Sequence, residues 1–240
     1  MSGPGSSGPP PTRPAGARRR AAATPCPPRP PRRAPPGGRP KPVGAWPLDE
    51  ASGSIARDTV GGRNGTATGV RWRAGKGGAA EFDGTGSQIV TRGPALKTGP
   101  GRSFSVSAWV LLTAKPGFFA TAVSQDATKV SGFYLQYSVE ENRWAFARPG
   151  VRAVSYTTPA VGTWTHLVGV CDGPGRKMRL YVDGVQEAAV DDTNPTISTG
   201  ALMIGRASHL GQASDFFPGA IRDVRAFQRP LTTPQIKNLT

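Results

Sequence analysis

The sequence has few of the residues on which several common site chemistries depend. It contains two cysteines and two histidines in 240 residues, too few for a disulfide-dense scaffold, a four-cysteine zinc site or a histidine-rich metal centre. No apolar run approaches the roughly 18 residues that a membrane-spanning helix needs. The sequence therefore predicts a protein without a membrane span that folds without disulfides.

Acidic and aromatic residues are missing from residues 1–42, which hold 14 of the 25 prolines and 9 of the 30 basic residues. Such a segment cannot bury a core, so we predict a disordered, locally polyproline II tail. The formal net charge of +15 is thus concentrated in this tail, and residues 43–240 are only mildly basic. We interpret 1–42 as a linker. The alternative is an arm that binds nucleic acid through its arginines, although no aromatic residue is interleaved to stack on bases.

No secretion signal is predicted in this tail. Three arginines at 18–20 precede three alanines, but the prolines at 25, 27 and 28 end the apolar region before it reaches roughly 7–15 residues. Cys26 has no partner nearby in the sequence.

From Val43 onward, short alternating apolar runs are broken by glycine, as in strands. The clearest strand is predicted over residues 104–111, where the even-numbered positions are apolar and Trp109 and Leu111 lie on the opposite face. Apolar groups on both faces predict a strand inside a sheet.

Two hairpins are predicted. Residues 133–137 and 144–146 flank an acidic turn, and 177–182 and 185–188 flank Asp183-Gly184, the strongest hairpin signal in the chain. Further strands are predicted over 164–171, 201–205 and 216–227, and a short helix capped by Thr233 over 234–239. About a dozen short strands predict two packed antiparallel sheets.

Six segments occur in an order and spacing that resemble one family. They are AWPLDE (45–50), AEFDG (80–84), FSVSAWV (104–110), GTWTHLV (162–168), LYVDG (180–184) and FPGAIRDVR (217–225). Together they closely resemble the laminin-G-like jelly-roll domain of the concanavalin A-like lectin/glucanase superfamily, over residues 43–240. The resemblance implies an all-β, two-sheet antiparallel jelly-roll sandwich, and tryptophans 46, 109 and 164 belong to its core pattern. It also implies an extracellular module, for which 1–42 would be the linker in a longer secreted protein. The composition is typical of a GC-rich bacterium.

The superfamily includes hydrolases, which carry Glu-x-Asp-x-Glu along one strand so that the carboxylates share a face. This sequence lacks that pattern. Only Glu81 and Asp83 stand two residues apart, and Asp83 precedes Gly84 at a turn, so we interpret both as structural. Cys171 and His166 lie in an apolar strand, which favours a packed thiol and imidazole over a nucleophile and base. We therefore predict that the chain is not an enzyme.

Many relatives of this type hold one calcium ion at the sandwich edge. The resemblance implies ligands from the loop at 57–66, where we expect Asp58 and Asn64, and from the last long strand, where Asp223 remains but Arg222 stands in place of an acid. Two alternatives stay open: Asp58 could form an Asx turn, and Asp223 could pair with a neighbouring arginine.

We predict a non-catalytic module that binds carbohydrate or protein ligands, with a structural calcium ion. The alternatives are a glycoside hydrolase and a nucleic-acid binder that works through the tail. A sugar-binding face would need exposed aromatic rings beside amides and carboxylates. Tyr137, Trp144, Tyr156 and Gln125-Asp126 are candidates, although core packing accounts for most such rings.

Overall fold

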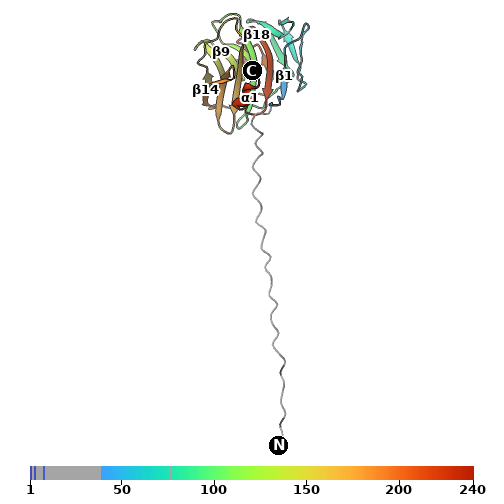
Figure 1. The fold of residues 1–240 in the computed structure, drawn as a ribbon, viewed down its shortest axis with the longest axis vertical. Coiled ribbons are helices and arrows are strands. Elements are labelled where there is room, and N and C mark those ends of the chain that lie inside the picture. Colours follow the sequence, from blue (N-terminus) through green and yellow to red (C-terminus); the bar gives the residue numbers. More distant parts are fainter. Residues whose placement is uncertain (2, 4–7, 9–38, 76) are drawn as a thin grey trace. The chain divides into compact units, whose positions relative to one another are not determined.

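The computed structural model describes residues 1, 3, 8, 39–75 and 77–240. Most of the predicted tail, with Cys26 and the arginines of the nucleic-acid hypothesis, lies outside these residues. Within them the chain forms two eight-stranded antiparallel sheets, a two-stranded hairpin and one short helix (Figure 1).

The first sheet is built from strands in both halves of the chain. Its members are β1 (Gly44–Trp46), β4 (Arg71–Arg73), β5 (Ala79–Asp83), β7 (Phe104–Leu112), β12 (Thr165–Asp172), β13 (Lys177–Val182), β14 (Val185–Asp191) and β18 (Pro218–Phe227). Their order is β14-β13-β12-β7-β18-β5-β4, and β1 also pairs with β18.

The second sheet faces the first. Its members are β2 (Ile55–Ala56), β3 (Gly65–Thr68), β6 (Gln88–Thr91), β8 (Ala120–Asp126), β9 (Ser131–Ser138), β10 (Arg143–Arg148), β11 (Val151–Val154) and β15 (Leu202–Ile204). Their order is β11-β10-β9-β8-β15-β6-β3-β2. Strands β16 (Ala207–His209) and β17 (Gln212–Ser214) form the separate hairpin. The predicted two-sheet jelly-roll sandwich is thus confirmed.

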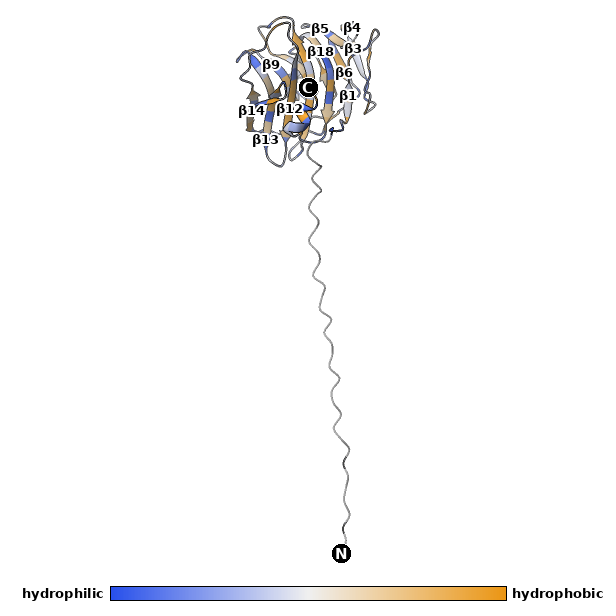
Figure 2. Ribbon diagram, viewed as in Figure 1, coloured by the Kyte–Doolittle hydropathy of each residue, from blue (hydrophilic) through white to orange (hydrophobic). Residues whose placement is uncertain are grey.

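The alternation of β7 places it at the centre of the first sheet, between β12 and β18. Phe104, Val106, Ala108 and Val110 are fully buried in the core between the sheets. They meet apolar residues of the second sheet such as Phe133, whose ring centroid lies 5.1 Å from that of Phe104. Figure 2 shows hydrophobic positions along the strands of the sandwich, with hydrophilic positions between them.

The turns of the predicted hairpins form where the sequence indicates. Asp183 and Gly184 both have positive φ, 48° and 80°, as a two-residue hairpin turn with right-handed twist requires. Asn142 at the β9–β10 turn also has positive φ.

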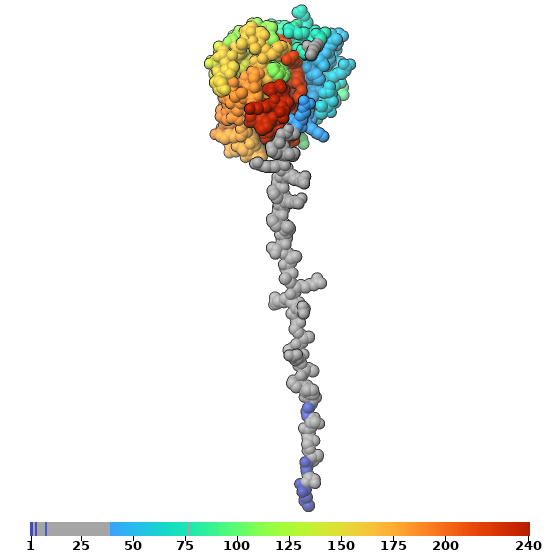
Figure 3. All heavy atoms as spheres, in the orientation of Figure 1, coloured from blue at the N-terminus to red at the C-terminus, as the bar shows by residue number. Residues whose placement is uncertain are grey.

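The helix α1 (Thr233–Lys237) covers part of the outer face of the first sheet. Ile236 and Leu239 pack there against Val168 and Tyr181. In Figure 3 the C-terminal residues, in red, cover part of this face. The helix begins one residue earlier than predicted. Thr232, not Thr233, is the N-cap. Its backbone N–H donates to the side chain of Gln235, as in a capping box.

In the part of the chain that the structure describes, no helix is long and apolar enough to cross a membrane.

Candidate functional site

Asp58, the first expected calcium ligand, is surrounded by backbone N–H groups. Its Oδ1 accepts hydrogen bonds from the N–H groups of Ala45, Val60 and Gly61, and its Oδ2 accepts one from Arg63, all at 2.9–3.0 Å. Burial alone would raise the pKa of Asp58, but these bonds outweigh it and hold the pKa below its ordinary value. The bond from Val60 is the Asx turn that the sequence left open as an alternative.

Asn64 lies directly beside Asp58. Its Oδ1 accepts a hydrogen bond from the backbone N–H of Asp58 at 2.9 Å. The guanidinium of Arg63 also lies in this loop, where it donates to the backbone oxygens of Val43 and Gly61. The structure therefore brings Asp58 and Asn64 together as hydrogen-bond acceptors that order the loop.

Asp223, the third expected ligand, forms a two-point ion pair with Arg225, at 2.7 and 2.8 Å. The neighbouring Arg222 stacks on two tryptophans, with its guanidinium carbon 4.4 Å from the ring centroid of Trp164 and 5.4 Å from that of Trp109. These two tryptophans lie partly exposed on the outer face of the first sheet, outside the core where the resemblance places them, whereas Trp46 is fully buried in it.

As these side chains are placed, they do not fit a calcium ion. Calcium needs six to eight oxygen ligands with free lone pairs. Here N–H groups point at the oxygens of Asp58 and Asn64, and a guanidinium occupies those of Asp223. Calcium binding stays a prediction of the resemblance, and the placement of these side chains predicts the opposite result.

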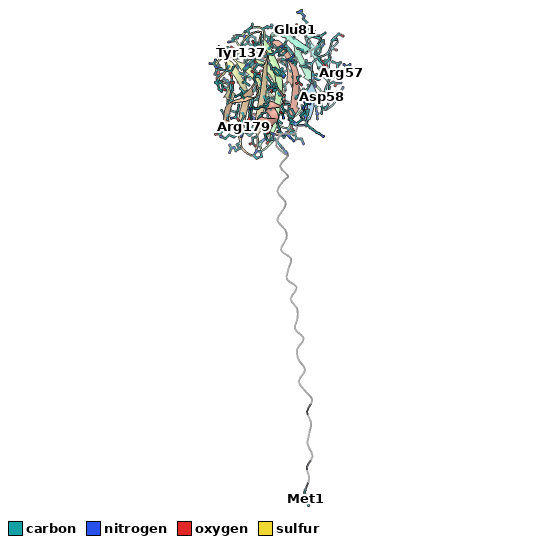
Figure 4. The ribbon with its side chains drawn as sticks, viewed as in Figure 1. Met1, Arg57, Asp58, Glu81, Tyr137 and Arg179 are labelled. Carbon is teal, nitrogen blue, oxygen red and sulfur yellow. The ribbon has the colours of Figure 1, made fainter. Side chains whose placement is uncertain are left out.

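Glu81 and Asp83, the single carboxylate pair with hydrolase-like spacing, lie on β5 and have structural partners. Glu81 forms an ion pair with Arg73. The Oδ1 of Asp83 accepts from the backbone of Thr85, Gly86 and Ser87; burial alone would raise its pKa, but these bonds hold the pKa far below its ordinary value. Figure 4 shows Asp58 near Arg57 at the edge of the domain, apart from Glu81. A permanently ionised Asp83 is unsuited to proton donation.

Cys171 and His166 are both buried, as the sequence predicts. Burial raises the pKa of the Cys171 thiol to about 11, which keeps it protonated. The ring of His166 packs on Trp109, with centroids 5.0 Å apart, and burial lowers its pKa to about 4. Neither side chain is accessible to a substrate.

Most of the expected sugar-binding candidates are structural. Tyr137 and Trp144 belong to the core, and Gln125 is fully buried, where it binds the backbone of Ala95, Leu96 and Ser198. Asp126 pairs with Arg206. Of the aromatic candidates, Tyr156 alone is exposed.

A cavity of about 520 Å³, which we call the second-sheet cavity, lies on the outer face of the second sheet. Its volume falls within the range of small-molecule sites. The side chains that give it chemical character are Phe119, Tyr134, Gln136, Arg152, His209 and Asp215.

The floor of the second-sheet cavity follows from the alternation of β9. Phe133, Leu135 and Tyr137 belong to the core, so Tyr134 and Gln136 point to the opposite face. Tyr134 lies opposite Ala147 of β10, whose small side chain leaves room above the sheet.

The rim is formed by segments from several parts of the chain. The β16–β17 hairpin carries His209 at the end of its first strand, and Asp215 follows its second. The hairpin is held against β9 by a hydrogen bond from the Ser208 N–H to the Ser131 hydroxyl, and against β8 by one from the Thr121 N–H to the Asp215 carbonyl. On the other side, Arg152 of β11 lies over the ring of Phe119 at 4.9 Å.

Burial dominates the electrostatics of this cavity. It raises the pKa of the Tyr134 hydroxyl to about 12, helped by the charges of Asp215 and Asp126. It also raises the pKa of Asp215, against a smaller opposing effect of His209. A desolvated carboxylate and a neutral phenol in a concave site are typical of a binding or functional site.

Sequence reasoning missed these residues, although it contained a signal for some of them. The alternation at 133–137 places Tyr134 and Gln136 on one non-core face. The hairpin turn next to His209 has positive φ at both Leu210 and Gly211, but a leucine at the first position gives no sequence signal for such a turn. Phe119, Arg152 and Asp215 carry no comparable pattern, because only the fold brings them together.

Comparison with solved structures shows similar folds in proteins of different activity. A sialidase from Trypanosoma rangeli, solved with the inhibitor DANA, aligns with 15% identity and a TM-score of 0.62 over 82% of this chain. This chain spans 32% of that sialidase. Domain 4 of AbnA, an extracellular arabinanase from Geobacillus stearothermophilus, was solved with arabinotriose; it aligns with 19% identity and a TM-score of 0.66, over 84% of this chain and 99% of the domain.

The receptor binding domain of botulinum neurotoxin type G is a third similar structure. It aligns with 12% identity and a TM-score of 0.59, over 82% of this chain and 50% of that one. At these identities the likenesses show a shared fold, which serves hydrolases and binding domains alike.

Sequence comparison gives the family. No curated protein sequence matches the chain. The sequence model of the concanavalin A-like lectin/glucanases superfamily, however, matches residues 82–237, well over half of the chain and most of both sheets. With the jelly-roll sandwich described above, this match shows that the chain belongs to the concanavalin A-like lectin/glucanase superfamily.

Proposed function

We propose that this protein is a non-catalytic carbohydrate-binding module whose ligand occupies the second-sheet cavity. The observation that carries the proposal is the lining of that cavity, where Phe119 and Tyr134 offer ring surfaces beside the polar groups of Gln136, His209 and Asp215. Rings that cover the apolar faces of a sugar, with hydrogen-bonding groups at its edges, are the chemistry that carbohydrate recognition requires.

A carbohydrate suits this cavity better than a protein surface does. The cavity is concave and its lining combines ring surfaces with polar groups, whereas a protein interface is centred on a broad apolar patch. The similar structures support this choice in part, since domain 4 of the arabinanase was solved with arabinotriose.

The chemistry of the lining argues against hydrolysis. Glycoside hydrolysis uses two carboxyl groups that flank the scissile bond. Among the described residues that line the second-sheet cavity, Asp215 is the one carboxylic acid. The pair Glu81 and Asp83 lies on the other sheet and is held by structural partners.

Calorimetric titration of the full chain with neutral oligosaccharides of arabinose, xylose, glucose and mannose tests the proposal. We expect one of these series to bind. Phe119→Ala should weaken that binding about fivefold or more, since a ring contact contributes ~1 kcal/mol. Tyr134→Phe, which removes one hydroxyl, should weaken it less.

Tyr156→Ala is the matched control, because Tyr156 is an exposed aromatic residue outside the cavity. It should bind as the unaltered protein does, and no reducing ends should appear on prolonged incubation. Binding that survives Phe119→Ala and Tyr134→Phe unchanged would place the ligand elsewhere, and release of reducing ends would show catalysis.

A further inference from the structure

The carboxylate of Asp215 differs from the other acidic groups around the second-sheet cavity. Asp126 pairs with Arg206, and Glu140 and Glu141 pair with Arg152. Asp215 is half-buried, and no hydrogen bond or ion pair from the described residues reaches its carboxylate; His209 acts on it only electrostatically and less than burial does. A desolvated carboxylate without partners has its hydrogen-bonding capacity free for a ligand.

The guanidinium groups of the two arginines at the cavity are engaged elsewhere. That of Arg148 is fully buried on the core side of the sheet, where it lies 5.3 Å from the ring centroid of Phe104, donates to the backbone oxygens of Thr98 and Thr196 and pairs with Asp192. Arg152 lies 2.8 Å from the carboxylates of both Glu140 and Glu141. On the rim opposite Asp215, Arg152 is therefore shared by two carboxylates and brings no unpaired positive charge into the cavity.

The free hydrogen-bonding groups complement hydroxyls. Asp215 accepts hydrogen bonds, and its two oxygens can receive two neighbouring hydroxyl groups. The Oε1 of Gln136 already accepts from Thr121, which leaves the amide N–H groups of Gln136 as donors. The hydroxyl oxygen of Tyr134 already accepts from the backbone of Ser131, which leaves its O–H as a donor.

We propose that the second-sheet cavity accepts neutral, hydroxyl-rich sugars and rejects sugars that carry a carboxylate. This inference rests on the proposed function and names its ligand class. A uronic acid unit would bring a second carboxylate beside Asp215, where the two charges repel and the guanidinium of Arg152 is already paired with Glu140 and Glu141. A neutral unit of the same size meets no such repulsion, and its hydroxyl groups donate hydrogen bonds to Asp215.

Competition calorimetry with the full chain, at pH 8 and physiological salt, tests the charge rule. The neutral oligosaccharide that binds best is titrated alone and again in the presence of an excess of a galacturonic acid trisaccharide. Competition is essential, because the basic residues of 1–42 can attract the acidic trisaccharide without involving the cavity.

We expect the acidic trisaccharide to leave the affinity of the neutral one unchanged in the unaltered protein. In Asp215→Asn, which keeps the shape of the side chain and removes its charge, it should compete and weaken the neutral ligand about tenfold or more. Asp191→Asn makes the same charge change at an exposed site on the first sheet and should behave as the unaltered protein does.

Equal competition by the acidic trisaccharide in the unaltered protein and in Asp215→Asn would overturn the charge rule while leaving carbohydrate binding intact. Absence of binding by every neutral series would overturn the proposed function, and the charge rule with it.

Discussion

The buried histidine His166 makes the stability of this domain depend on pH in a way that can be calculated from its surroundings. The ring is 1% exposed, stacks on Trp109, and has a buried Nδ1 without a hydrogen-bond partner among the described residues. Burial lowers the pKa of His166 to about 4. The charge of Asp223 acts to raise this pKa, and the charge of Arg225 acts to lower it. In the unfolded chain the same side chain titrates near its ordinary value of about 6.5.

The sign of the effect follows from which state binds the proton. Between about pH 6.5 and pH 4, the unfolded chain takes up a proton that the folded protein refuses, so acidification favours unfolding. The contribution is fully present above pH 6.5 and is lost as the pH falls to 4. A pKa difference of about 2.5 corresponds to about 3 kcal/mol, a large share of the stability of a typical domain.

Chemical unfolding of the full chain at pH 7.5, 5.5 and 4.5 measures this loss. His166→Phe keeps a flat ring on Trp109 but has no titrating group at this position, so the free energy of unfolding of this variant should vary much less with pH over this range. If the phenylalanine variant does not fold, His166→Gln takes its place. Asp215 has a raised pKa, so acidification just above its ordinary pKa favours the folded state, opposite to the effect of His166. Both proteins contain Asp215, so its contribution cancels when the free energies of unfolding of variant and unaltered protein are subtracted.

His209→Gln is the matched control, because His209 is exposed. It should keep the full pH dependence of the unaltered protein. Parallel curves for the unaltered protein and His166→Phe between pH 6.5 and 4.5 would refute the reasoning, since they would mean that the folded protein accepts the proton at His166 as readily as the unfolded chain does.

Two further predictions concern structural carboxylates. Asp192→Asn should cost about 3–5 kcal/mol of stability in chemical unfolding, because it leaves the fully buried Arg148 without its counter-charge. Asp191→Asn on the same segment removes only an exposed ion pair and should cost far less. Similar costs for the two variants would contradict the pairing. Asp58→Ala should lower stability by at least about 2 kcal/mol, because four backbone N–H groups lose their acceptor. The unaltered protein should melt at the same temperature in millimolar calcium and in chelator, and a rise of several degrees in calcium would show that the loop opens to bind the ion.

The fold could be predicted to a large extent from the sequence, because its signals are local. The alternation of 104–111 carries the central strand β7, and Asp183-Gly184 carries the β13–β14 turn, since each depends on backbone geometry within a few residues. The burial of Cys171 and His166 follows from the apolar run around them. For Trp109 the alternation of 104–111 predicts the outer face correctly, whereas the core pattern of the resemblance misplaces both Trp109 and Trp164. Neither signal reveals that Arg222 of β18 stacks on both rings.

The candidate site was decided by the tertiary structure. Phe119, Arg152 and Asp215 come from three separate segments, and no spacing in the sequence relates them; the second sheet and the β16–β17 hairpin bring them to one cavity. The partners of the expected calcium ligands were likewise decided by the tertiary structure, because a sequence shows which residues carry carboxylates but not which groups lie against them. Residue types and turn chemistry determine strands and hairpins locally, whereas a binding site depends on which distant side chains remain without partners after folding.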